Sequence, residues 1–164
     1  MKKCGIILQR MNKKMLKIEI LNVNNINEYS NFINYLKKCS WESAAEYLTE
    51  TLENNELTDS EKVIVAYLNG EIVGFAALVN ESVAESFNGT PYLDHLFVDE
   101  AHRNKGIATK LVDKIIELAK ENNKVLYLVT VSHELFYKKL GFETIAKSTV
   151  IDCIDECFIM KKEI

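Results

Sequence analysis

The first third of the chain alternates between polar and apolar positions in two distinct ways. Residues 15–21 (MLKIEIL) alternate with a period of two, which predicts a strand. Residues 25–38 carry apolar side chains at helical spacing, and a second helix is expected over residues 41–53. Ser40 is the expected N-cap of that second helix, with Ser43 as the alternative.

The middle of the chain has the pattern of three consecutive strands. Apolar runs at residues 62–68 and 71–79 are separated by Asn69 and Gly70, the strongest short signal for a β-hairpin. Pro91 opens the next strand, at a position where its missing N–H group is tolerated. This third strand leads into the segment that carries the candidate chemistry.

Residues 92–142 have the order strand, glycine-containing turn, amphipathic helix, strand and short helix. This order predicts a parallel βαβ crossover followed by a helical appendage. Two weaker strands are expected at residues 142–146 and 157–161. The expected inner face of the main helix consists of Ile107, Ala108, Leu111, Val112, Ile115, Ile116, Leu118 and Ala119.

Length and composition fit one ordinary domain. A chain of 164 residues should bury about 70% of the surface that its unfolded form exposes, which is enough for one core. We expect a single domain over residues 15–164, preceded by an N-terminal extension at residues 1–14. No run of eighteen apolar residues is present, and the apolar run at residues 4–8 is too short for a signal peptide. The sequence therefore predicts a cytoplasmic protein that does not act at a membrane.

Charge and cysteine content narrow the partners further. The formal net charge of −4 argues against nucleic acid as the main partner. In a reducing compartment the four cysteines, at positions 4, 39, 153 and 157, are expected to be free thiols. Cys153 and Cys157 have the spacing of half a zinc site, but no second closely spaced Cys or His pair accompanies them. We therefore expect no bound metal.

A loop at residues 103–108 (RNKGIA) lies between the predicted strand and the main helix. The first N–H groups of that helix have no intrahelical acceptor, and the helix dipole adds partial positive charge there. Residues 103–124 hold six Lys or Arg and three Asp or Glu, a local net charge of 6 − 3 = +3. Such a loop can bind a pyrophosphate, with Gly106 leaving room for the phosphate. The alternative is a plain helix N-terminus whose glycine serves only local geometry.

These residues resemble the GNAT family of acyl-CoA-dependent N-acetyltransferases, whose signature is Q/R-x-x-G-x-G/A between a strand and a helix. Arg103, Gly106 and Ala108 match it. The aromatic helix at residues 135–142, which ends in Leu-Gly-Phe, is a second point of resemblance. The order of elements over residues 15–161 is also similar to that family. The resemblance implies an α/β fold whose central mixed sheet is flanked by helices and splayed between its fourth and fifth strands.

The resemblance further implies acetyl-CoA as co-substrate. In the family, main-chain groups of the fourth strand bond the pantetheine arm as an added strand would. Two segments before the main helix and at its start, and one residue near the end of the fifth strand, are therefore expected to contact acetyl-CoA. They comprise Leu96, Phe97, Val98, Arg103, Asn104, Lys105, Gly106, Ile107, Ala108, Thr109 and Thr130.

The implied reaction is attack of a neutral primary amine on the thioester, which needs a base and an acid for the leaving sulfur. Tyr137 matches the family tyrosine that commonly serves as this acid. Asp94 is the first choice for the base and His95 the runner-up, favoured if a bulge turns it toward the site. His133 follows the fifth strand, where it lines the cleft, caps the next helix or faces solvent.

Strand alternation assigns the residues of the fourth strand to two faces. Tyr92, Asp94, Leu96 and Val98 are expected on one face, and Leu93, His95 and Phe97 on the other. This assignment separates Asp94 from His95.

The acceptor is expected to be a small-molecule or peptide amine, bound near residues 34–52 by a monomer or homodimer. Residues 41–61 contain seven acids and no Lys or Arg, which would attract a cationic amine. The acids are Glu42, Glu46, Glu50, Glu53, Glu56, Asp59 and Glu61. Their helical spacing equally fits a solvated helix face.

Two other classes of function compete with acetyl transfer. One is a catalytically silent acyl-CoA-binding regulatory module, against which Tyr137 argues. The other is a nucleotide-binding βαβ domain, against which the missing GxGxxG and GxxxxGK[ST] motifs argue. Stabilisation by acetyl-CoA, but not by NAD or ATP, would separate the last class from the others.

Overall fold

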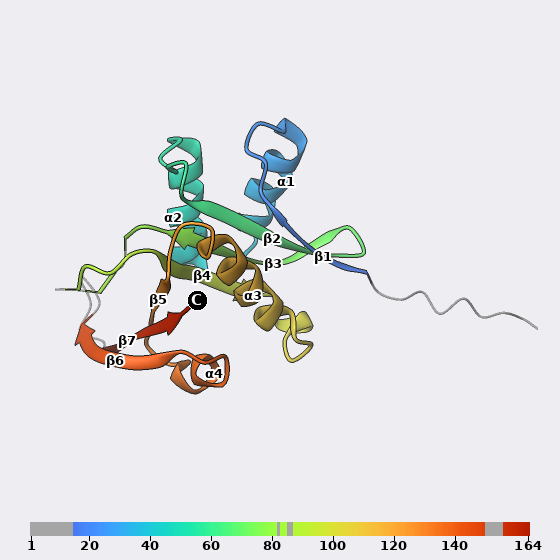
Figure 1. Cartoon of the computed structure of the whole chain (residues 1–164). Coiled ribbons are helices and arrows are strands. Elements are labelled where there is room, and N and C mark those ends of the chain that lie inside the picture. The colour runs from blue at the N-terminus through green and yellow to red at the C-terminus, as the bar shows by residue number, and fades with distance from the viewer. Residues whose placement is uncertain (1–14, 82, 85–86, 150–155) are drawn as a thin grey trace, which may run out of the picture.

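The computed structural model describes residues 15–81, 83–84, 87–149 and 156–164. Within these residues, seven strands form one mixed sheet in the order β1-β2-β3-β4-β5-β7-β6, with helices on both faces (Figure 1). Neighbouring strands pair antiparallel except β4 and β5, which are parallel. The strands are β1 Leu16–Ile20, β2 Lys62–Leu68, β3 Glu71–Val79, β4 Tyr92–Val98, β5 Val125–Thr130, β6 Glu143–Thr149 and β7 Glu156–Glu163. The predicted mixed α/β sheet is confirmed.

One face of the sheet is covered by α1 (Ile26–Leu36) and α2 (Glu42–Glu53). The side chain of Asn25 caps α1 by accepting hydrogen bonds from two backbone N–H groups of the first turn. The predicted cap of α2 at Ser40 or Ser43 is wrong. Trp41 occupies the N-cap position and makes no side-chain capping bond, so α2 is stabilised by its buried apolar face.

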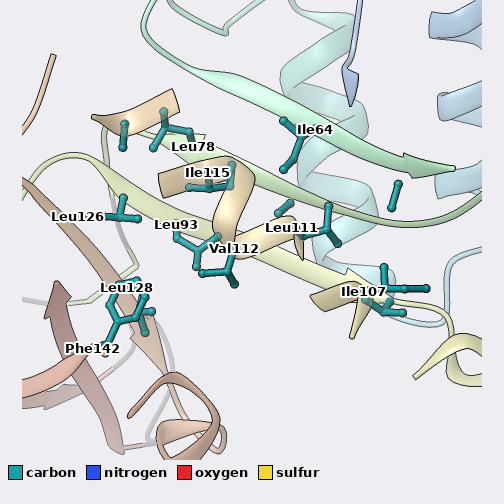
Figure 2. Packing of buried hydrophobic residues seen from close by; sticks show 14 of the residues in the cluster. Ile64, Leu78, Leu93, Ile107, Leu111, Val112, Ile115, Leu126, Leu128 and Phe142 are labelled. Carbon is teal, nitrogen blue, oxygen red and sulfur yellow. The ribbon is translucent and has the colours of Figure 1, made fainter. Parts of the chain in front are cut away.

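The opposite face is covered by α3 (Ile107–Ala119), which packs across the central strands (Figure 2). Ile107, Leu111, Val112 and Ile115 point from α3 into a core cluster that also contains sheet residues such as Leu93. The predicted inner face of this helix is confirmed. Because α3 begins at Ile107, this packing also fixes where the N-terminus of the helix lies relative to the preceding loop.

Strand β4 contains a bulge. Its residues Asp94 and Phe97 pair with Ala77 and Phe75, so three steps along β4 match two along β3. His95 accordingly takes a left-handed backbone conformation, with φ of 50°. The extra residue shifts the alternation of side chains by one position from there onward.

The bulge makes the predicted faces of β4 wrong. Tyr92 and Phe97 pack together in the cluster beneath α1 and α2, whereas Leu93 and Val98 belong to the cluster beneath α3. Strict alternation had placed Tyr92 and Val98 on the same face. The physical reason is the unpaired residue in the bulge, which reverses the facing of every side chain after it.

Gly74 of β3 permits the close approach of the bulged strand. A Cβ atom added to Gly74 would lie 2.5 Å from the carbonyl oxygen of Phe97 and 3.2 Å from the Cα atom of Val98. Both are backbone atoms of β4. A side chain at this position would therefore push the two strands apart.

Strands β4 and β5 separate after their first residues. Their only ladder pair in the described structure is Tyr92 with Tyr127, beside a hydrogen bond from the Tyr127 N–H to the Pro91 carbonyl (3.0 Å). On its other side, β5 pairs antiparallel with β7 along its whole length. The predicted splay between the fourth and fifth strands is confirmed, and it leaves the rest of β4 without a β5 partner.

Candidate active site

The loop at residues 103–106 turns the chain from β4 into α3. Asn104 and Gly106 both adopt positive φ values, 58° and 77°. A Cβ atom added to Gly106 would meet no atom of the protein within 4 Å. The protein alone therefore requires glycine here only for its positive φ value. The open space over Gly106 is compatible with a ligand approaching the backbone there.

The N-terminus of α3 lacks groups that would compete with an anion. Gly106 provides no side-chain cap, and the first turn contains no acidic residue. The Lys110 N–H donates to the Gly106 carbonyl (3.2 Å), which leaves the preceding N–H groups ahead of the first intrahelical bond. The side chain of Ile107 is buried in the core and that of Ala108 packs against it. The side chains of these two residues therefore turn toward the core at the start of α3.

The two cations of the loop bond to backbone carbonyls nearby. The Nε of Arg103 donates to the Val98 carbonyl at 2.9 Å, and its guanidinium lies 5.9 Å from the Phe97 ring centroid. The Nζ of Lys105 donates to the carbonyl of Ala101 at 2.6 Å. Arg103 thus connects the loop to the end of β4, and both charges remain close to the N-terminus of α3.

A hydrogen bond between helix α1 and the end of β4 was not foreseen from the sequence. The hydroxyl of Tyr35 donates to a carboxylate oxygen of Asp99 at 2.6 Å, while the Asp99 N–H donates to the Val73 carbonyl at 2.9 Å. Burial, with the Asp99 hydrogen bond and charge, raises the pKa of Tyr35 well above its ordinary value. The bond therefore joins a protonated phenol to a carboxylate and fixes α1 against β4.

The Leu-Gly-Phe sequence ends helix α4 (Glu134–Lys139) in a Schellman motif. Gly141 has φ of 84°, and its N–H donates to the Lys138 carbonyl at 3.0 Å. The Phe142 N–H donates to the carbonyl of Tyr137 at 3.1 Å. The motif thus ties Phe142 directly to the residue predicted as the acid.

The ring of Tyr137 is held between two other aromatic rings. Its centroid lies 5.0 Å from that of Phe136 and 6.0 Å from that of Phe142, both in edge-to-face geometry. Burial, followed by the negative charge of Asp94, raises the pKa of Tyr137 above its ordinary value. The phenol is therefore protonated near neutral pH. Asp94, the predicted base, is thus the charged group that acts on Tyr137.

The bulge places His95 beside Asp94 and against helix α2. The His95 N–H donates to Asp94 Oδ1 at 2.7 Å, and its Nδ1 atom lies 3.5 Å from Asp94 Oδ2. The imidazole stacks on Tyr47 with centroids 5.0 Å apart and an interplanar angle of 9°. Trp41 is the third ring, 6.1 Å from the imidazole. Sequence reasoning missed Trp41 and Tyr47, although both lie in the segment expected to bound the acceptor.

Thr130 and His133 both contribute to the turn between β5 and α4. The hydroxyl oxygen of Thr130 accepts the His133 N–H at 3.1 Å, and Thr130 itself is buried. Its O–H group can still donate to a ligand. His133 occupies the N-cap position of α4 and is exposed, with its Nδ1 atom 3.0 Å from the hydroxyl of Ser132. Of the open interpretations of His133, solvent exposure agrees with the structure, and although the residue occupies the N-cap position, its side chain makes no capping hydrogen bond.

The acidic stripe of α2 faces away from these rings. Glu42, Glu46, Glu50 and Glu53 are exposed and line a shallow depression against the end of α1, together with Lys37. None of these glutamates is among the charges that act on Tyr47. This arrangement favours the solvated-face interpretation for the four glutamates.

Among residues 15–81, 83–84, 87–149 and 156–164, no group of three or more His, Cys, Asp or Glu could hold a metal ion. In the same part of the chain, no helix combines the length and apolar character that crossing a bilayer requires. Cys39 and Cys157 carry free thiols. Cys4, Cys153 and the predicted extension at residues 1–14 lie outside the described residues.

Comparison with known proteins agrees with this geometry. Residues 26–142 match the model of the acetyltransferase (GNAT) family. The chain belongs to this family. The matched range runs from the start of α1 to the Leu-Gly-Phe sequence, and so includes both the glycine loop and Tyr137.

Two N-acetyltransferases are similar to this chain in sequence. An uncharacterized N-acetyltransferase of Methanocaldococcus jannaschii is 32% identical over 122 residues, which cover 66% of this chain and 48% of that protein. The spermine/spermidine N(1)-acetyltransferase of Bacillus subtilis is 30% identical over 90 residues, covering 50% of this chain and 59% of the relative. The chain thus spans about half the length of the curated relatives it matches.

Solved GNAT structures share the fold. An aminoglycoside 6′-N-acetyltransferase complexed with coenzyme A has a TM-score of 0.67 at 19% identity, covering 90% of this chain and 96% of its own. An acetyltransferase of the family from Streptococcus pneumoniae has a TM-score of 0.66 at 17% identity, covering 92% and 100%. At these identities the likeness establishes the fold.

Proposed function

We propose that the protein is an N-acetyltransferase that moves the acetyl group of acetyl-CoA to a primary amine. The observation that carries this proposal is the opening between β4 and β5. The glycine loop lies where β4 leads into α3, and the negative charge of Asp94 acts on the phenol of Tyr137. The CoA complex of the aminoglycoside 6′-N-acetyltransferase, which shares the fold, supports the choice of co-substrate.

Acetyl-CoA would bind through backbone groups at two places. Its pyrophosphate would accept hydrogen bonds from the N–H groups at the start of α3, residues 106–109, with Arg103 and Lys105 adding positive charge beside them. Its pantetheine arm would pair with the main chain of residues 96–98, which has no β5 partner. The side chain of Thr130 would donate a further hydrogen bond from the opposite strand.

The chemistry requires the amine to be neutral when it attacks the thioester carbonyl carbon. Collapse of the tetrahedral intermediate breaks the C–S bond, the sulfur leaves as a thiolate, and the ammonium product loses a proton. Tyr137 would donate its proton to the thiolate. Since burial weakens its acidity, its contribution depends on the placement of the O–H group, which the rings of Phe136 and Phe142 restrict.

Asp94 remains the first choice for the base, acting directly or through water, because its charge acts on Tyr137. The bulge strengthens the case for His95. It removes the objection that His95 faces away from Asp94, and the two side chains lie 3.5 Å apart. Either Asp94 or His95 would then accept the proton of the amine and pass it to solvent.

Release of CoA in the presence of an amine panel tests the proposal. Wild-type protein should release CoA in an amine-dependent way, with an acetylated product visible by mass spectrometry. Acetyl-CoA and CoA should also raise the unfolding temperature, since a hundredfold excess over Kd stabilises by about 2.7 kcal/mol, whereas NAD and ATP should not. Binding of acetyl-CoA without transfer to any amine would contradict the proposal and indicate the silent regulatory module.

A further inference from the structure

Trp41, Tyr47 and His95 form an aromatic cluster between the start of α2 and the bulge of β4. His95 is nearly covered, with 12% of its side chain exposed, because Tyr47 stacks on it. The other two rings remain open to solvent, at 40% exposure for Trp41 and 54% for Tyr47. Large exposed aromatic faces beside a reactive site are features of ligand recognition.

The charges that act on the Tyr47 ring of this aromatic cluster are carboxylates. Asp94 adjoins His95, and the carboxylates of Asp94, Glu61 and Glu81 all act on Tyr47. Burial first, and then these three charges, raises the pKa of Tyr47, against an opposing hydrogen bond with Thr51. No Lys or Arg contributes to this effect among the described residues.

Glu61 is held in a fixed position rather than free in solvent. One of its carboxylate oxygens accepts the Asn80 N–H at 2.9 Å, and the other accepts the N–H and hydroxyl of Thr58 at 3.0 and 2.9 Å. Desolvation opposes ionisation, but these hydrogen bonds from Asn80 and Thr58 lower its pKa. Glu61 therefore presents a stable negative charge that acts on Tyr47.

An aromatic face flanked by carboxylates binds cations, through the ring quadrupole and through charge attraction together. The nitrogen that attacks the thioester cannot be that cation, because it must be neutral when it reacts. The bound positive charge must then belong to a second group of the acceptor. The charge of Asp94 acts on both Tyr137 and Tyr47, whereas the charges of Glu61 and Glu81 act on Tyr47 and are not among those that act on Tyr137.

We propose that the aromatic cluster, with Asp94, Glu61 and Glu81, is an acceptor subsite for aliphatic diamines. The reacting nitrogen lies at the Asp94 end, and the second ammonium group lies against the solvent-exposed part of the Trp41 and Tyr47 rings. This inference rests on the proposed acetyl transfer and adds the substrate class. It assigns selectivity to the rings and these carboxylates rather than to the glutamate stripe of α2.

Three acceptors of matched chain length test the subsite: diaminobutane, butylamine and aminobutyrate. Each has a chain of four carbon atoms, whose fourth carbon carries an ammonium group in diaminobutane, is a methyl group in butylamine and is a carboxylate carbon in aminobutyrate. The kcat/KM for diaminobutane should exceed that for butylamine about tenfold, the size expected for one cation–π contact in a partly desolvated site. Aminobutyrate should be the poorest acceptor because its carboxylate faces three others.

Substitutions in the subsite show which residues cause the preference for diaminobutane. Tyr47→Leu keeps an apolar side chain but removes the ring, and it should lower kcat/KM for diaminobutane about fivefold, mainly through KM. The loss with butylamine should be several-fold smaller. Glu81→Gln should raise the KM for diaminobutane, whereas Glu50→Gln, on the outer stripe of the same protein, is the matched control and should not.

Two outcomes separate this inference from the proposed function. Equal kcat/KM values for diaminobutane and butylamine would overturn the subsite while leaving acetyl transfer intact. If no amine supports CoA release, acetyl transfer fails, and calorimetric titration of the CoA-loaded protein with diaminobutane and butylamine decides the subsite. Tighter binding of diaminobutane that is lost in Tyr47→Leu would support it, and equal or absent binding would refute it.

Discussion

Replacing Gly74 with alanine should disturb the strand that the proposed acetyl-CoA site uses. The added Cβ atom would lie 2.5 Å from the Phe97 carbonyl oxygen, where ordinary contacts begin at 3.4 Å. The strands must therefore separate locally by about 0.9 Å (3.4 − 2.5). Because the obstructing atoms are backbone atoms of β4, no side-chain rotation relieves the contact.

The magnitude follows from overpacking a buried site. Forced backbone shifts of this kind cost about 1–3 kcal/mol. In a domain of this size each kcal/mol lowers the unfolding temperature by roughly 2–4 °C, so we expect a fall of roughly 2–12 °C. Since residues 96–98 would move with the strand, kcat/KM for acetyl-CoA should fall by about tenfold to a hundredfold.

Thermal unfolding, calorimetry with CoA and steady-state kinetics measure these effects. Gly70→Ala is the matched control, because Gly70 has φ of 90° and a Cβ atom there would meet nothing within 4 Å. It should cost about 1–2 kcal/mol through backbone strain alone and leave CoA affinity unchanged. If Gly74→Ala matched this control in both stability and affinity, the idea that Gly74 sets the position of β4 would be refuted.

Three further predictions concern the acid, the base and the phosphate loop. Tyr137→Phe should lower kcat severalfold or more while CoA affinity, measured by calorimetry, is kept; an unchanged kcat would exclude Tyr137 as the acid. Because the raised pKa of Tyr137 keeps the phenol protonated, wild-type kcat should not fall on the alkaline side below a pH of about 10. Asp94→Asn should change the acidic limb of the pH–rate profile, and an unchanged profile would transfer the role of base to His95 or water. Gly106→Glu should abolish measurable acetyl-CoA binding in a folded protein, because it places bulk and negative charge in open space at the N-terminus of α3; near wild-type affinity would contradict the placement of the pyrophosphate.

Local pattern was sufficient to predict most elements of the fold. The β2–β3 hairpin has the expected turn, with Asn69 and Gly70 both at positive φ, because few other residues tolerate that geometry. The inner face of α3 also followed from spacing alone, since one apolar stripe on a helix has only one direction in which to pack. These signals depend on neighbouring residues and are therefore readable in one sequence.

The bulge of β4 was not predictable in this way. The sequence of Tyr92–Val98 fits a strand equally well with or without the bulge, because both registers place apolar residues against a core. The evidence for the bulge lies in β3, where Gly74 allows the approach of the Phe97 carbonyl. A contact between strands more than twenty positions apart decided which face His95 occupies, and with it the neighbours of Asp94.

The role of the acidic residues was the hardest feature to predict from sequence, because a count of acids does not say which way their side chains point. Residues 41–61 appeared as one field of seven acids, but the structure divides them. The glutamates of α2 face solvent, while Glu61 is held by Asn80 and Thr58 and acts on Tyr47 together with Glu81 and Asp94. An exposed stripe attracts cations only at long range and is screened by salt, whereas fixed carboxylates beside an aromatic face select between bound molecules. Neutralising the stripe should therefore alter the salt dependence of acceptor association, and neutralising Glu81 should alter which acceptor is preferred.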